Sequence, residues 1–274
     1  MVVVIVTAKL SELFIPYLLE RLVDAFGRVP PVAIGFGGFV IAFVLPIAGL
    51  RLLSLMLWRM SGFLASELQP RVMSDLMERA FSAIMDQSYR FFSDNFGGAL
   101  VRRAQAVANS FRTLANAFWW DILPVVVTVA SSMILLGLRS PLFAAIIGVW
   151  IIGLISSQLL VSRLKLPYDA ERASKHAAII GLLSDDITNA TNVMLFNGRK
   201  SEERLMRQRV DLWRFFNVKQ WRIAESGNAI QNTFNFFCEV LTMGLAVWLW
   251  MHGTMSLGAV MFVQSLLWVL FNNT

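Results

Sequence analysis

The sequence has one cysteine, two histidines and no phosphate-binding loop. Cys238 has no second cysteine to pair with, which excludes a disulfide-stabilised scaffold. His176 and His252 each stand alone, so neither predicts a metal site. The pattern GxxxxGK[ST], whose backbone amides and lysine hold nucleotide phosphates, is absent from all 274 residues. We therefore expect no catalytic residue, metal ligand or cofactor in this chain.

Charged residues are also scarce. They make up 15% of the sequence, against about 25% in soluble proteins, whereas apolar residues reach 57% and the mean hydropathy is +0.61. A core of this size cannot bury so much apolar surface, which excludes a soluble enzyme and a disordered chain and makes a lipid bilayer the expected surrounding. The formal net charge of +6 then indicates Lys and Arg kept on one side of a membrane, and nucleic acid is not an expected partner.

Stretches with few or no charges locate the membrane spans, because about 20 apolar residues in a helix cross a hydrocarbon core of about 30 Å. A glycine-rich run at 35–38 lies inside one of them, and we interpret it as helix packing through small residues. The six predicted spans are about 1–26, 31–60, 115–138, 141–165, 222–251 and 256–274.

Tight turns alternate with long polar connections between these spans. The long connections, 59–114 and 163–225, carry 19 of the 24 Lys and Arg residues, which predicts that both lie in the cytoplasm. Their apolar residues recur at helical spacing, so we expect the membrane helices to continue into them. The prediction is a single domain over 1–274, an all-α protein of the plasma (inner) membrane with six transmembrane helices, long cytoplasmic helical extensions and both termini in the cytoplasm.

Two motifs lie near the middle of these connections, SYRFFSDNFGGALVRR at 88–103 and SDDITNATNVMLFNGRKSEE at 184–203. Both resemble the intracellular loops of ABC exporters of the six-helix, type-1 transmembrane class. Residues 14–26 and 256–262 also resemble parts of that family's first and sixth helices. The pattern departs from the family at Val107, where an aspartate is frequent, and no amphipathic elbow helix precedes the first span. The residues that match the two loops are Phe91, Phe92, Asp94, Asn95, Gly98 and Arg103, and Asp186, Asn189, Val193, Phe196 and Glu203.

The resemblance implies a permease domain that forms half of a translocation pathway and pairs with a second transmembrane domain. A nucleotide-binding domain, on a partner chain or in a further segment of the same protein, would bind ATP and Mg²⁺. Short coupling helices at about 93–98 and 192–198 would dock on that ATPase. Alternatively, the phenylalanines of these loops pack only within their own hairpins. The implied coupling residues are Phe91, Phe92, Asp94, Asn95, Gly98, Asn192, Val193, Phe196 and Asn197.

Ionisable residues inside the spans predict a polar pathway, because a charge at the centre of a membrane helix costs at least about 2.5 kcal/mol. At 1.5 Å per residue, Glu239 lies roughly 18 Å and Glu12 roughly 22 Å from the nearest external turn. Asn235 is one turn from Glu239 on the same face, and Gln264 is in the next span. We expect Asn235, Glu239, Gln264 and Glu12 in the translocation pathway, or else in hydrogen bonds that join helices.

Two other classes of protein remain open at this point. The chain resembles part of an ATP-hydrolysing translocase but has no ATPase site of its own. It could therefore be a non-transporting or regulatory membrane subunit, or the remnant of a split gene. A secondary transporter is disfavoured, since that class predicts broken helices and short cytoplasmic loops, whereas the long connections here predict long helical legs.

Overall fold

The computed structural model describes residues 1–28, 31–94 and 97–272, and within these ranges it contains helices and no strand. The chain divides into two compact units, one of residues 1–144 and 241–274 and one of residues 145–240. The helices Leu45–Met85, Pro141–Thr188 and Arg199–Met251 extend from predicted spans into the long connections, as expected.

Helix α1 (Val2–Arg28) is the centre of the first unit. It packs against α3 (Leu45–Met85), α6 (Leu123–Gly137) and α10 (Leu257–Phe271). α10 lies so close to α1 that a side chain at position 258 would collide with the carbonyl oxygen of Glu20, which is why a glycine stands there. Ile5, Ala8 and Leu13 of α1 are buried against these neighbours.

Two short π-helices interrupt this unit, and each ends two residues before a proline. η1 (Val40–Val44) precedes Pro46, and η2 (Ala117–Ile122) precedes Pro124. A proline ring lacks the amide hydrogen and clashes with the carbonyl four residues earlier, and the wider π turn accommodates both effects without breaking the helix. Each of these helices therefore stays continuous through its proline.

The glycine run in α2 (Pro31–Phe39) differs from its predicted role. Gly35 has φ +67°, a left-handed conformation that breaks the helix, and neither Gly35 nor Gly37 has an atom of another helix near its would-be Cβ. The run therefore contains a kink at Gly35, and its glycines Gly35 and Gly37 make no close contact with another helix in the described part of this chain. Only glycine adopts such a φ at no steric cost, which explains the residue at position 35.

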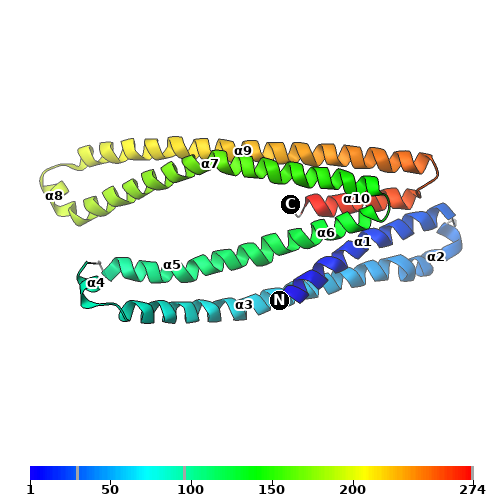
Figure 1. Ribbon diagram of the computed structural model, residues 1–274, viewed down its shortest axis with the longest axis horizontal. Helices are drawn as coiled ribbons and strands as arrows, with labels where there is room; N and C mark the ends of the chain where they lie inside the picture. Colours follow the sequence, from blue (N-terminus) through cyan, green and yellow to red (C-terminus); the bar gives the residue numbers. More distant parts are fainter. Residues whose placement is uncertain (29–30, 95–96, 273–274) are drawn as a thin grey trace. The chain divides into compact units, whose positions relative to one another are not determined.

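Two helical hairpins extend to short helices at their tips (Figure 1). In the first unit, α3 and α5 (Gly97–Asn116) run side by side and are joined through α4 (Tyr89–Asp94). Gln69 Nε2 donates a hydrogen bond to Asn116 Oδ1 across this pair, at 3.0 Å. The other hairpin, of which residues 145–240 form the second unit, consists of α7 (Pro141–Thr188) and α9 (Arg199–Met251), which run side by side and are joined through α8 (Ala190–Leu195).

Small residues facing large ones bring α7 and α9 into contact. A Cβ at Gly153 would lie 2.7 Å from Phe234, and one at Gly227 would lie 2.9 Å from Val161. Gln158 Nε2 donates to Gln231 Oε1 at 3.0 Å between these contacts. The two helices therefore pack as a matched pair along this stretch.

Replacing Gly227 by leucine should lower the free energy of unfolding by about 1–3 kcal/mol, because Val161 is β-branched and cannot turn out of the way. Gly148→Leu is the matched control, since no atom lies within 4 Å of its would-be Cβ. We expect that substitution to be neutral or stabilising, because leucine favours a helix over glycine by up to about 1 kcal/mol. Thermal unfolding of both variants in detergent tests the packing, and equal melting temperatures would contradict it.

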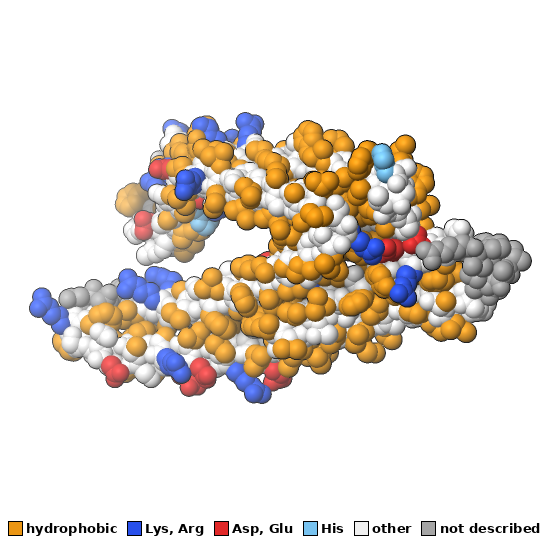
Figure 2. Space-filling view, turned by 45° about the vertical axis from the view of Figure 1, so that its right-hand side comes forward, with side chains coloured by type: hydrophobic (Ala, Val, Ile, Leu, Met, Phe, Trp, Pro, Cys, Tyr) orange, Lys and Arg blue, Asp and Glu red, His pale blue; other side chains and the backbone are white. Residues whose placement is uncertain are grey.

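Five helical segments of the described residues are long and apolar enough to cross a membrane: Val2–Gly27, Gly35–Met85, Leu100–Gly137, Pro141–Thr188 and Arg199–Met251. α10 is also apolar but shorter, with 15 residues. Apolar side chains cover most of the face seen in Figure 2. Soluble proteins rarely expose apolar patches this large, so the exposed side chains are suited to lipid.

Candidate functional site

A polar cluster around Glu12 lies among the apolar helices of the first unit. The Glu12 carboxylate forms a salt bridge with Lys9 Nζ at 3.0 Å, on its own helix. From α3, Ser54 Oγ and Trp58 Nε1 donate hydrogen bonds to Glu12 Oε1 at 2.9 and 2.8 Å. Lys9 also lies over the Trp58 ring, 5.2 Å from its centroid. One carboxylate therefore joins α1 to α3 through two side chains.

Burial makes this cluster costly unless it is fully paired. The side chain of Lys9 is 8% exposed and that of Glu12 is 20% exposed. Each ion loses hydration here, and the salt bridge with its additional hydrogen bonds compensates for that loss. A cavity of about 250 Å³ adjoins Glu12 and is also lined by Arg51, Ser265 and Asn272. A polar molecule in this cavity would contact Glu12 directly.

The predicted pathway residues on α9 lie in the second unit. Asn235 Oδ1 accepts a hydrogen bond from Trp150 Nε1 of α7 at 2.9 Å, and Trp150 is 3% exposed. Glu239 is half-buried one turn further along α9. Asn235 therefore has the helix-joining hydrogen bond that was the alternative to a pathway role. Gln264 lies half-buried on α10, in the first unit.

A second polar cluster joins the end of α1 to the turn after α6 and to the start of α10. Arg139, in the turn between α6 and α7, forms a salt bridge with Glu20 at 2.6 Å. The carboxylate of Asp24 accepts hydrogen bonds from Ser256 Oγ at 2.8 Å and from the Gly258 amide at 2.9 Å. Ser256 caps α10 by accepting a hydrogen bond from the Ala259 amide at 3.0 Å. We call these contacts the α1 clasp.

Replacing Asp24 by alanine should lower the free energy of unfolding by about 1.5–3 kcal/mol, because α10 loses a charged hydrogen-bond acceptor at its amino end. Amide hydrogen exchange at Gly258 and Ala259 should increase together with the fall in melting temperature. Asp211→Ala is the control, since Asp211 and Arg214 form an exposed pair worth at most about 1 kcal/mol. Unchanged exchange at the start of α10 would show that the clasp does not hold that helix.

The tip of the first hairpin carries two of the predicted coupling phenylalanines. Phe91 and Phe92 lie in α4 with ring centroids 5.7 Å apart in an edge-to-face arrangement. Phe92 is exposed and Phe91 is half-buried. Asp94 ends α4, Gly98 lies in the first turn of α5, and Asn95 falls outside the described residues.

The tip of the second hairpin presents a continuous apolar surface. Met194, Leu195 and Phe196 are 78%, 75% and 84% exposed. Asn192 and Val193 belong to α8, and Phe196 is the residue that ends it. These three side chains form an exposed apolar patch in a row at the end of the hairpin.

The backbone conformation after Phe196 fixes the turn that carries Met194, Leu195 and Phe196. The Gly198 amide donates to the Val193 carbonyl at 2.8 Å, and the Asn197 amide donates to the Met194 carbonyl at 3.2 Å. Asn197 has φ +52°. This is the Schellman arrangement that ends a helix, and asparagine is one of few side chains that tolerate it. Asn197 therefore acts by shaping the turn.

The tip helices differ in position from the predicted ones. The structure has α4 at Tyr89–Asp94 in place of 93–98, and α8 at Ala190–Leu195 in place of 192–198. At the second tip the reason is the left-handed residue Asn197, which cannot continue a helix. At the first, α4 begins directly after Ser88, whose carbonyl and hydroxyl both accept from the Phe91 amide.

Sequence reasoning missed the partners of the buried charges. Ser54, Trp58 and Arg139 were not singled out, although each is a polar residue inside or beside a predicted span. Their contacts join residues 42 to 119 positions apart, which spacing along one helix does not reveal. The turn after α8 did carry a signal, because Asn-Gly after an apolar run is typical of a helix end.

The chain offers no site for a nucleotide or metal among the residues described. No three His, Cys, Asp or Glu side chains within residues 1–28, 31–94 and 97–272 gather closely enough to hold a metal ion. The 274-residue sequence also lacks the phosphate-binding loop.

Comparison with known proteins shows the family of this chain. Residues 1–274 match the family described as the ABC transporter transmembrane region. A curated relative, an uncharacterized ABC transporter ATP-binding protein of Haemophilus influenzae, is 27% identical over 226 residues, which cover 78% of this chain and 35% of that protein. A solved bacterial Atm1-family ABC exporter with ATP bound superposes with a TM-score of 0.82 at 18% identity, covering 99% of this chain and 47% of that one.

The chain thus spans about a third of the curated relative's length and about half of the solved exporter. The structural match confirms the predicted all-α exporter fold, and the family match confirms the resemblance seen in the two loop motifs. Since the match extends from the first residue to the last, this chain belongs to the ABC transporter transmembrane region family.

Proposed function

We propose that the chain is the permease half of an ATP-driven exporter, and that α4 and α8 transmit the movement of an ATPase domain to the membrane helices. The apolar tip of α8 carries this proposal. Three consecutive apolar side chains stand exposed there, on a turn whose backbone is fixed by two hydrogen bonds. A fixed turn presents them without a large cost in conformational entropy.

The lengths of the helices support a lever mechanism. The 48 residues of α7 and the 53 of α9 correspond to roughly 70 and 80 Å of helix, against about 30 Å of hydrocarbon core. More than half of each helix therefore lies beyond the hydrocarbon. Packed helices move as rigid bodies, so displacement of α8 would be carried into the membrane.

Glu12 is the proposed pathway residue with the most support. The α1 clasp holds Glu20 level with the ends of α6 and α10, and Glu12 lies eight residues, about 12 Å, further along α1. That depth is near the middle of the hydrocarbon. The adjoining cavity gives a passing molecule access to its carboxylate. Asn235, Glu239 and Gln264 remain proposed as further members of the pathway.

The proposed partners follow from the family and the charge distribution. A second transmembrane domain, identical or different, would complete the pathway. A nucleotide-binding domain would bind ATP and Mg²⁺ and dock on both tips. The Lys and Arg residues of 59–114 and 163–225 support an inner-membrane orientation with the tips and both termini in the cytoplasm.

Purification from membranes and reconstitution into liposomes test this function. We expect an ATP-binding polypeptide or domain to co-purify with the chain. We also expect vanadate-sensitive ATP hydrolysis to drive the efflux of at least one compound from a panel of fluorescent test compounds. A chain that purifies with no ATPase, and whose liposomes hydrolyse no ATP, would instead support the non-transporting subunit.

A further inference from the structure

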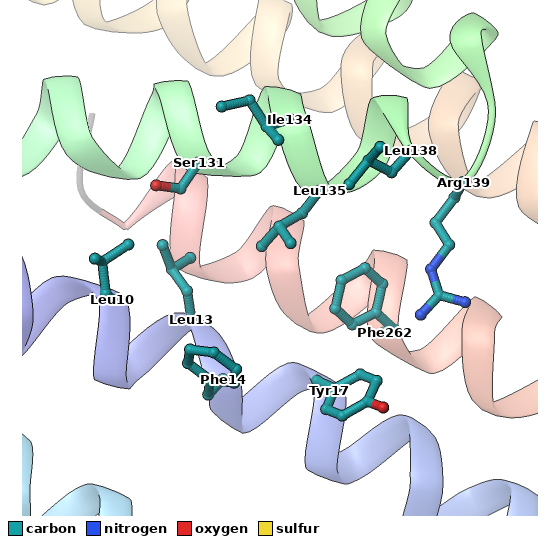
Figure 3. A pocket seen from close by; sticks show the side chains of 10 residues that line it. All are labelled: Leu10, Leu13, Phe14, Tyr17, Ser131, Ile134, Leu135, Leu138, Arg139 and Phe262. Atoms are coloured by element: carbon teal, nitrogen blue, oxygen red, sulfur yellow. The ribbon is translucent and has the colours of Figure 1, made fainter.

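A cavity of about 590 Å³ lies between α1, α6 and α10 of the first unit (Figure 3). Its floor is buried, since Leu13 and Phe262 are 4% and 2% exposed. Its rim is formed by exposed apolar side chains, Phe14, Ile134 and Leu138. The volume lies in the range of about 300–1,000 Å³ that is typical of small-molecule sites. The cavity is thus an open apolar slot between membrane helices.

One end of this slot is polar. Figure 3 shows Arg139 and Tyr17 near one end of the slot and Leu10 towards the other. Arg139 and Tyr17 also line a neighbouring cavity of about 780 Å³, to which Arg21 and Asp24 contribute. The apolar slot and the charged cavity therefore share two lining side chains, Arg139 and Tyr17.

The arrangement has the polarity of a membrane leaflet. Arg139 lies in the turn between two apolar helices, which is the depth at which arginine side chains reach lipid headgroups. Leu10 is seven residues before Tyr17 on α1, about 10 Å further from that surface. The slot therefore leads from headgroup depth towards the hydrocarbon.

The polar end carries two arginines, Arg21 and Arg139, and two carboxylates, Glu20 and Asp24. Both carboxylates are already engaged, Glu20 in the salt bridge with Arg139 and Asp24 in the hydrogen bonds from Ser256 and the Gly258 amide. Arg21 lies over the Tyr17 ring at 4.9 Å and forms no salt bridge with any carboxylate in the described part of the chain. A guanidinium that forms no salt bridge, beside a second one that is 35% exposed, is suited to a phosphate group.

We propose that this slot binds a glycerophospholipid of the bilayer, with the phosphate at Arg21 and Arg139 and one acyl chain between α1, α6 and α10. The bound lipid would join the three helices that the α1 clasp also holds. This site is separate from the proposed export function, because its occupancy does not depend on ATP or on a transported compound.

Photo-cross-linking of the assembled protein in nanodiscs tests the site. The probes are phosphatidylglycerol with a diazirine in its acyl chain and diacylglycerol with the same label. We expect phosphatidylglycerol to label peptides of α1, α6 and α10 about tenfold more than diacylglycerol does, since only the former has a phosphate. Arg21→Ala should reduce its labelling to the diacylglycerol level.

A second variant tests the apolar part without removing a charge. Leu135→Trp places a bulky ring in the slot and should reduce labelling by both probes. Leu159→Trp on α7, at another exposed apolar position, is the control and should leave labelling of these peptides unchanged. Equal labelling by the two probes, or labelling unaffected by both Arg21→Ala and Leu135→Trp, would overturn the proposal.

Discussion

Replacing Phe196 by alanine is expected to uncouple ATP hydrolysis from transport while leaving the fold intact. The side chain is 84% exposed in this chain, so its loss removes little from the folded core. An aromatic side chain at the centre of an interface contributes about 2 kcal/mol or more, equivalent to roughly 30-fold in the docking constant. Efflux from proteoliposomes per ATP hydrolysed is the quantity to measure, alongside the melting temperature.

Phe63→Ala is the matched control, because Phe63 is an exposed phenylalanine on α3 that lies far along the helix from α4, which begins at Tyr89. It should retain wild-type coupling. If Phe196→Ala and Phe63→Ala transport equally well, the docking role of α8 is wrong. A fall in the melting temperature of Phe196→Ala would instead support the alternative that Phe196 packs within its own hairpin.

Replacing Glu12 by alanine is expected to destabilise the protein by about 3–5 kcal/mol, the usual cost of removing one partner of a buried ion pair. Lys9 would lose its carboxylate, and Ser54 and Trp58 would lose the acceptor that joins α1 to α3. Thermal unfolding measures the effect. Glu67→Ala is the control, because Glu67 forms an exposed salt bridge with Arg71 worth at most about 1 kcal/mol.

A double variant separates stability from transport at this position. Lys9→Met with Glu12→Met replaces the ion pair by apolar side chains, which commonly restores stability. If Glu12 lies in the pathway, the double variant should fold normally and still lose most transport. Restored stability together with normal transport would show that the cluster only joins α1 to α3, and a stable Glu12→Ala variant would contradict its structural importance.

Local features of the fold could be predicted because they depend on neighbouring residues. The absence of charges from 141–162 predicts a membrane helix, and the helical spacing in the polar connections predicts that helices continue through them. The structure has α7 as one helix from Pro141 to Thr188, as these patterns indicate. Hydropathy and helical spacing operate within one helix, so one sequence is enough to read them.

Contacts between distant residues could not be predicted in the same way. Glu12 is a charged residue in an apolar span, which identifies it as important but does not show that Trp58 is its partner. Gly35 illustrates a different limit, since a glycine run is equally compatible with close packing and with a left-handed kink. The loop motifs did locate both tips, and the structure adds which side chains of α8 are exposed.

Photo-cross-linking from position 196 tests most directly whether α8 docks on an ATPase domain. Benzoylphenylalanine would replace Phe196 in one variant and Phe63 in the other, and both would be irradiated in native membranes. We predict an adduct with a nucleotide-binding polypeptide from position 196 and none from position 63. No such adduct from position 196, or modification of that position by a reagent confined to the outside of the cell, would contradict the proposed coupling.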